Sequence, residues 1–164
     1  MMMITIPKVM SFSGGTKILD MMPTGYNIDY VNSLLKTLGE EGRNAYLYNQ
    51  IPLDMIYPLF FGISFCLIVA FILKKLGKLD GHLFYICFLP LFSGLFDYCE
   101  NIGIITMLNL YPDCSNLLIQ TTNVFSVLKS SFTTINFIIL ITLLIVLGIK
   151  KLFMKVRLDR GINS

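Results

Sequence analysis

Three long apolar stretches dominate the chain. They cover residues 53–73, 83–110 and 137–148, and the helical pattern of the third begins much earlier, near Leu117. A helix needs about 20 residues to cross about 30 Å of hydrocarbon. The pattern therefore predicts an all-α membrane protein with three transmembrane helices. The alternative is four spans, which would require a hairpin near DYCEN together with another crossing or a re-entrant segment.

The region before the first apolar stretch has a different pattern. SFSGGTK and MMPTGYN are rich in turn-forming residues. In NIDYVNSLLKTLG, apolar residues recur at helical spacing, and Gly39 follows as a C-terminal stop. This segment predicts a short amphipathic helix at the outer interface or over the end of the bundle. EEGRNAYLYNQ is a candidate second helix that runs into the first span, bent near Pro52 or Pro58.

Composition supports the membrane class and one domain. Of the 164 residues, 55% are hydrophobic and 14% are charged, against about 25% charged in an ordinary soluble domain. The N-terminus lacks the apolar core and cleavage site of a secretory signal peptide, so the first membrane helix is expected to act as its own insertion signal. We divide the chain into an extracytoplasmic N-terminal cap (residues 1–51), a transmembrane bundle (52–153) and a basic cytoplasmic tail (154–164).

The distribution of charge predicts the orientation. The loop after the first span and the C-terminal tail together hold eight of the thirteen basic residues, whereas residues 1–51 carry equal numbers of basic and acidic residues. Basic segments of membrane proteins stay in the cytoplasm. We therefore expect both basic segments inside and the N-terminus outside, in the inner (cytoplasmic) membrane of a bacterial cell. Two crossings between the basic segments give three spans.

Polar residues interrupt the apolar stretches at helical spacing. Asp97, Glu100 and Asn101 stand at positions i, i+3 and i+4 and share one helix face. Two further polar stripes are expected on the other helices. The residues that extend this pattern are Ser93 on the second helix, Gln120, Asn123, Ser126, Lys129 or Ser130, and Thr133 on the third, and Asp54 with Asn49, Gln50 and Tyr57 on the first.

The ionisable residues of the three helices are expected to lie at a similar depth in the membrane. At 1.5 Å per residue, Asp54 and Lys129 each lie about 29 Å from the cytoplasmic end of their helix, and Glu100 about 26 Å. An ionised group facing lipid is costly, up to about 2.5–3.5 kcal/mol at the bilayer centre. These residues are therefore expected to face one another, with Lys129 paired to Glu100 or Asp97. The alternative for Lys129 is the outer interface, where its ammonium would reach water.

No familiar catalytic or metal-binding motif accompanies these residues. The four cysteines are scattered, and neither a zinc pattern, a phosphate-binding loop nor a hydrolase motif occurs. No basic tract interleaved with aromatic residues suggests nucleic-acid binding. We expect no metal, no cofactor and no nucleic acid; membrane lipid is the expected partner, and a homo-oligomer is left open.

Three functional hypotheses follow, beside a purely structural role for the polar residues. The leading hypothesis is an outer-leaflet polar site that binds a lipid or small amphiphile, with Tyr57 and Tyr98 in its wall. The second is a lipid-modifying enzyme that uses the carboxyl groups as general acid and base, although no nucleophile–base pair is visible. The third is a subunit of an oligomeric proton-coupled transporter, since three helices are too few to line a pore in a monomer.

Several short segments of the chain form a recognisable series: ILDMMPTGYN, GEEGRNAYLYNQ, DMIYP, LFDYCENIG and the loop with YPD. In these segments, and over about residues 18–153 as a whole, the chain resembles a family of small bacterial multi-pass membrane proteins, with GEEGR and DYxEN as the most specific elements. The resemblance implies no function. It implies a set of characteristic polar positions, namely Arg43, Tyr46, Asp54, Asp97, Glu100 and Asn101. It also makes the first ten or so residues look like an extra start, with Met21 or Met22 as alternative starts.

Arg43 has two possible settings. On a straight helix it would stand about 45 Å from the cytoplasmic end of the first span, well above the hydrocarbon. It would reach the acids only if the chain bends at Pro52 or the cap folds over the bundle. Otherwise we expect a local pair with Glu40 or Glu41.

Overall fold

The computed structural model describes residues 5–162, with side chains through Val156. The regular elements of the described chain are all helices, without strands, and three helical segments are long and apolar enough to cross a membrane. The predicted all-α architecture with three spans is therefore confirmed. The elements are α1 (Thr5–Phe12), η1 (Leu19–Met21), α2 (Ile28–Ala45), the π-helix η2 (Tyr46–Gln50), α3 (Ile51–Leu76), η3 (His82–Phe88), α4 (Leu89–Leu110) and α5 (Asn116–Ile162).

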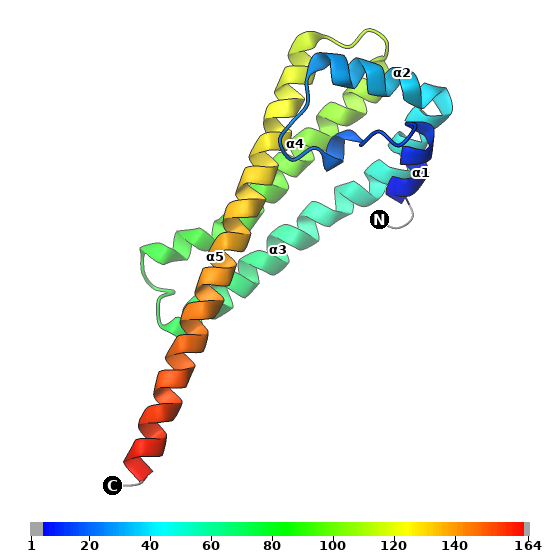
Figure 1. Cartoon of the computed structure of the whole chain (residues 1–164). Coiled ribbons are helices and arrows are strands. Elements are labelled where there is room, and N and C mark those ends of the chain that lie inside the picture. The colour runs from blue at the N-terminus through cyan, green and yellow to red at the C-terminus, as the bar shows by residue number, and fades with distance from the viewer. Residues whose placement is uncertain (1–4, 163–164) are drawn as a thin grey trace.

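The bundle consists of α3, α4 and α5, with the N-terminal cap over one end (Figure 1). Helix α4 packs along both α3 and α5, which contact each other less extensively. The cap lies beside the end of the bundle at which α4 ends and α5 begins. It consists of α1, α2 and the segment between them, which contains η1. The cap can therefore reach side chains that project between the three long helices.

Helix α4 continues without a break through DYCEN, which removes the hairpin that a four-span arrangement requires. The predicted second span is helical over its whole length, but its first turns form the tighter 3₁₀ helix η3 before α4 begins. Helix α5 begins where the pattern predicted, at Asn116, and runs to Ile162. The basic tail is thus a continuation of α5, because nothing in its sequence stops a helix before Gly161.

The amphipathic helix of the cap is also present. Helix α2 buries Val31, Leu34, Leu35 and Leu38, the residues of its predicted apolar face. Its regular geometry is interrupted at Gly39, whose φ of 61° lies in the left-handed region. The chain then resumes a helix to Ala45 and passes through η2 into α3.

The segment before α2 belongs to the core of the cap. The side chains of Val9, Ile18 and Leu19 are fully buried and pack in one cluster with residues of α2. Asn27 closes the N-terminus of α2, since its side-chain oxygen accepts a 2.8 Å hydrogen bond from the backbone N–H of Tyr30. These contacts hold the chain between α1 and α2 in a defined position.

Gly103 sets the closest approach of α4 to α5. A Cβ atom at this position would fall 2.6 Å from Cγ2 of Thr122 and closer still to its Oγ1. We expect Gly103→Ala to push the helices apart and to lower the free energy of unfolding by about 1–3 kcal/mol, the usual cost of overpacking. Thermal unfolding in detergent micelles measures the effect.

Gly148→Ala is the matched control, because a Cβ there meets nothing within 4 Å. Alanine favours a helix over glycine by about 1 kcal/mol, so this variant should melt at or slightly above the wild-type temperature. Equal melting temperatures for Gly103→Ala and Gly148→Ala would contradict the close approach at Thr122.

Candidate functional site

The polar face of α4 is buried against α5. The side chains of Glu100 and Asn101 are inaccessible to solvent, and Asp97 is 5% exposed. Nζ of Lys129 lies 2.6 Å from Oε2 of Glu100 and 3.1 Å from Oδ1 of Asp97. The ion pair predicted for Lys129 is therefore present. One turn away, the hydroxyl groups of Ser93 and Thr133 lie 2.5 Å apart and join the same two helices.

Helix α3 contributes Asp54 to the same site. Asp54 is 3% exposed, and its backbone carbonyl accepts a 3.2 Å hydrogen bond from Nδ2 of Asn101. The same amide nitrogen lies 3.4 Å from Oδ1 of Asp97. The amide of Asn101 thus connects α3 to the ion pair, so the three helices do place their polar residues at one level.

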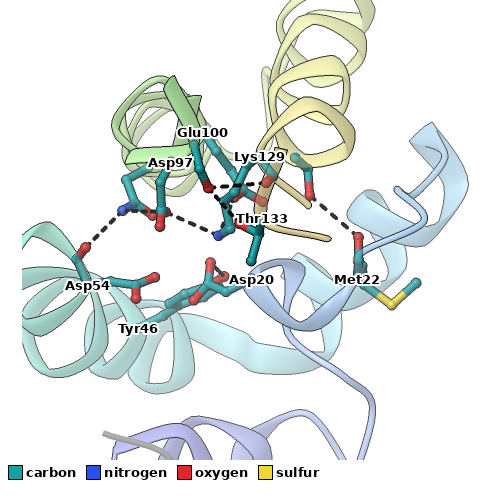
Figure 2. Close-up of polar contacts among 11 residues, drawn as sticks. Asp20, Met22, Tyr46, Asp54, Asp97, Glu100, Lys129 and Thr133 are labelled. Atoms are coloured by element: carbon teal, nitrogen blue, oxygen red, sulfur yellow. Dashed lines mark hydrogen bonds and ion pairs between the residues drawn. The ribbon is translucent and has the colours of Figure 1, made fainter. Parts of the chain in front are cut away.

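The N-terminal cap supplies an acidic residue that the sequence analysis missed. Asp20, in η1, accepts a 2.8 Å hydrogen bond on Oδ1 from the hydroxyl of Tyr46, which is fully buried. Figure 2 shows Asp20 and Tyr46 facing Asp54 and the ion pair. The only signal for Asp20 in the sequence is its position beside two apolar residues in ILDMMPTGYN. We define the polar cluster as Asp20, Asp54, Asp97, Glu100, Asn101 and Lys129.

Two polar residues of α5 fasten the cap beside the polar cluster. Oδ1 of Asn123 accepts a 2.7 Å hydrogen bond from the backbone N–H of Tyr26. One turn further, the hydroxyl of Ser126 donates to the backbone carbonyl of Met22 over 3.4 Å. The polar stripe predicted on the third helix therefore contacts the cap as well as α4. Gln120 was predicted to belong to this stripe, but its side chain is exposed.

Arg43 and Tyr98 do not belong to the polar cluster. The guanidinium of Arg43 donates a 3.0 Å hydrogen bond to the carbonyl of Leu35 and stacks over the ring of Tyr111, 4.5 Å from its centre. It therefore neither reaches the buried acids nor pairs with Glu40 or Glu41, because the kink at Gly39 turns it toward the α4–α5 loop. Tyr98 lines a separate groove between α3 and α4.

A pocket of about 530 Å³ adjoins the polar cluster. A second pocket of about 230 Å³ shares four of its lining residues, so the two are neighbouring parts of one cleft. Tyr57 is 50% exposed, and through it the cleft reaches the surface of the bundle. The first pocket is lined by Ile6, Asp20, Met21, Pro23, Asp54, Tyr57, Asp97 and Lys129, and the second adds Phe61, Ser93, Ser130, Thr133 and Thr134.

Several buried polar atoms around this cleft have no hydrogen-bond partner within the described chain. An unpaired buried polar group costs about 1–3 kcal/mol. Two of the residues concerned, Asp20 and Asp54, line the cleft itself, so a molecule in the cleft can satisfy their unpaired oxygens. The oxygens concerned are Oδ2 of Asp20, the hydroxyl of Tyr26, Oδ2 of Asp54, Oε1 of Glu100 and Oδ1 of Asn101; the nearby nitrogen is Nε2 of Gln50.

Burial raises the pKa of two cap residues, Asp20 and Tyr26. Removal from water, with the nearby charge of Asp54, raises the pKa of Asp20 from 3.8 to about 8, although Lys129 opposes the change. Burial and the charges of Glu100 and Asp20 also raise the pKa of the Tyr26 hydroxyl above its ordinary value. At neutral pH, Asp20 is therefore mostly protonated and can donate as well as accept a hydrogen bond.

The described residues contain no group of three or more His, Cys, Asp or Glu side chains placed to hold a metal ion.

Comparisons with models of protein families, with curated proteins and with solved structures find no match for this chain. The chemistry of the site therefore has to be inferred from its own residues. These combine carboxyl groups, one ammonium and an apolar wall in a single cleft.

Proposed function

We propose that the protein is a multi-pass membrane protein that binds a lipid or small amphiphile at the polar cluster. The observation that carries this proposal is the cleft itself. Its lining combines the charged residues Asp20, Asp54, Asp97 and Lys129 with apolar side chains such as Ile6 and Met21. An amphiphile matches both parts, because its head can pair with the charges while its hydrocarbon chain lies along the apolar wall.

The proposed orientation has the cap outside and the C-terminus in the cytoplasm. Nζ of Lys150 lies 3.3 Å from the backbone carbonyl of Lys75 and 3.2 Å from that of Leu76. The two basic segments are thus neighbours at one end of the bundle, and the cap lies at the other end (Figure 1). The positive-inside rule assigns the lysine-rich end to the cytoplasm of a bacterial cell, which places the polar cluster in the outer leaflet of the inner membrane.

The cap gives the cleft its fourth wall. Three transmembrane helices enclose little space, and the cleft is bounded in addition by the cap residues Ile6, Asp20, Met21 and Pro23. Pro23 and Tyr57 are exposed at its edge. In this arrangement a ligand enters from the surface of the bundle beside Tyr57, and its head is shielded from water by the cap.

Native mass spectrometry of the protein purified from membranes in mild detergent tests this function. We expect a defined small-molecule adduct on the wild type that is lost in Ser130→Phe, because Ser130 lines the cleft and a phenyl ring there would fill it. Ser131→Phe is the matched control, since Ser131 is exposed and does not line the cleft. It should retain the adduct.

Melting temperatures within a few degrees of the wild type would show that both variants are folded. A wild-type protein that carries no adduct, and that takes up none from added bacterial lipid extract, would refute the proposed function. An adduct held equally by Ser130→Phe and Ser131→Phe would place the ligand elsewhere.

A further inference from the structure

The unpaired polar atoms at the polar cluster are mostly hydrogen-bond acceptors. Oδ2 of Asp20 and Oδ2 of Asp54 are buried, belong to residues that line the cleft, and accept no hydrogen bond from the described chain. Asp54 is 3% exposed, so its carboxyl group is not the free end of a flexible side chain. Glu100 Oε1 and Asn101 Oδ1 are unpaired as well, but neither residue lines the cleft. A ligand that completes the site must therefore bring donors.

The polar cluster has more acidic than basic groups, which also favours a ligand that brings positive charge. The cluster holds four carboxyl groups and one ammonium. Among the side chains that the structure describes, ion pairs join Lys129 to Asp97 and Glu100, and no Lys, Arg or His nitrogen comes within 4 Å of Asp20 or Asp54. Buried carboxylates without a cation are costly. A site built in this way attracts positive charge and repels a phosphate or carboxylate.

We propose that the head group of the ligand is a protonated amine, whose N–H groups donate to the carboxyl groups of Asp20 and Asp54. The inference rests on the proposed function and names the chemical class of the ligand. A primary ammonium offers three donors and no acceptor, and the unpaired atoms that line the cleft, Oδ2 of Asp20 and Oδ2 of Asp54, are both carboxyl oxygens. A quaternary ammonium would supply the charge without the donors. A metal ion is not favoured, because the described acids are not grouped as metal ligands.

Binding of the amine is coupled to release of a proton. The proton on Asp20 reduces the negative charge that faces Asp54, and a bound ammonium would replace it while the proton passes to solvent. The pKa of Asp20, about 8 without an amine beside it, would then fall because a cation stabilises the carboxylate. The charged and titratable groups that face Asp20 are Asp54 on α3, Tyr46 on η2, Glu100 on α4, Lys129 on α5 and Tyr26 in the cap.

The test compares three short amphiphiles of equal chain length, octylamine, octanol and octanoate. Calorimetry on the protein in phosphatidylcholine nanodiscs measures their binding, with empty nanodiscs as the blank. We expect octylamine to bind at least about tenfold more tightly than octanol, because hydrogen bonds between charged partners are stronger than those between neutral ones. Octanoate should bind most weakly.

Two substitutions test whether Asp20 and Asp54 bind the amine. Asp20→Asn and Asp54→Asn keep the shape of the side chain and remove a carboxylate, and each should weaken octylamine binding about tenfold while octanol binding stays the same. Asp29→Asn is the control, because Asp29 is exposed on α2 outside the cleft; it should leave all three affinities unchanged. Octylamine affinity of the wild type should also rise as the pH rises toward the pKa of Asp20, while that of Asp20→Asn should not.

The outcomes separate the inference from the proposed function. Equal binding of octylamine and octanol, both lost in Ser130→Phe, would overturn the amine head group and leave the amphiphile site standing. Octylamine affinity that is unchanged in both Asp20→Asn and Asp54→Asn would also overturn the amine assignment. Failure of all three compounds, together with a wild type free of any adduct, would remove the amphiphile site as well.

Discussion

Replacing Lys129 by methionine should lower the free energy of unfolding by about 3–5 kcal/mol, the usual cost of leaving a buried ion pair without one partner. The ammonium of Lys129 lies 2.6 Å from Glu100 and 3.1 Å from Asp97, and both carboxyl groups remain buried when it is removed. Methionine has a similar length, so the loss should reflect charge more than volume. Denaturant or thermal unfolding in detergent micelles measures the change.

A second substitution distinguishes lost charge from lost packing. Lys129→Met combined with Glu100→Gln removes one of the two stranded carboxylates, and we expect it to recover part of the lost stability. Lys36→Met, on the exposed face of α2, is the control and should unfold like the wild type. If Lys129→Met unfolded like Lys36→Met, Lys129 would be a surface lysine and the polar cluster would lack its central contact.

The stability of the empty protein should fall as the pH rises from about 4 to about 8. The pKa of Asp20 is raised by burial from 3.8 to about 8, so in this window the folded protein keeps a proton that the unfolded chain loses. Folding is then favoured by low pH, and the contribution is fully present below pH 3.8 and gone above about pH 8. The slope for one proton is at most about 1.4 kcal/mol per pH unit.

Asp20→Asn should flatten this dependence, because an amide does not titrate. Unfolding at a series of pH values across the window, for wild type, Asp20→Asn and the exposed control Asp29→Asn, measures the slope that belongs to Asp20. A wild-type profile that rises with pH between 4 and 8, or one that Asp20→Asn leaves unchanged, would contradict a buried protonated Asp20.

Loss of the cap should affect both the site and the end of the bundle beside it. The cap is fastened to α5 by hydrogen bonds from the backbone N–H of Tyr26 to Asn123 and from the hydroxyl of Ser126 to the backbone carbonyl of Met22. The buried residues of the cap also share one hydrophobic core with Ile104 and Met107 of α4. Single substitutions in the cleft, such as those at Ser130, therefore test the site more specifically than removal of the cap.

The sequence alone was sufficient to predict the three spans, the amphipathic α2 and the shared level of Asp54, Asp97, Glu100 and Lys129. These features depend on local periodicity and on a constant rise per residue, because a helix converts spacing along the chain directly into a face and a depth. A second rule is that ionisable groups within the membrane face one another, because exposing them to lipid is costly. The prediction that Lys129 pairs with Glu100 or Asp97 follows from these two rules, and the structure shows it in contact with both.

Only the tertiary structure placed Asp20 in the polar cluster, moved Arg43 away from it onto Tyr111, and formed the cleft beside Tyr57. Each of these depends on the path of the cap, where turns and the kink at Gly39 break the helical periodicity. Beyond such a break, the spacing of residues along the sequence no longer determines the direction in which their side chains point. The position of the cap is instead decided by contacts with α5 about a hundred residues away, which no local pattern encodes.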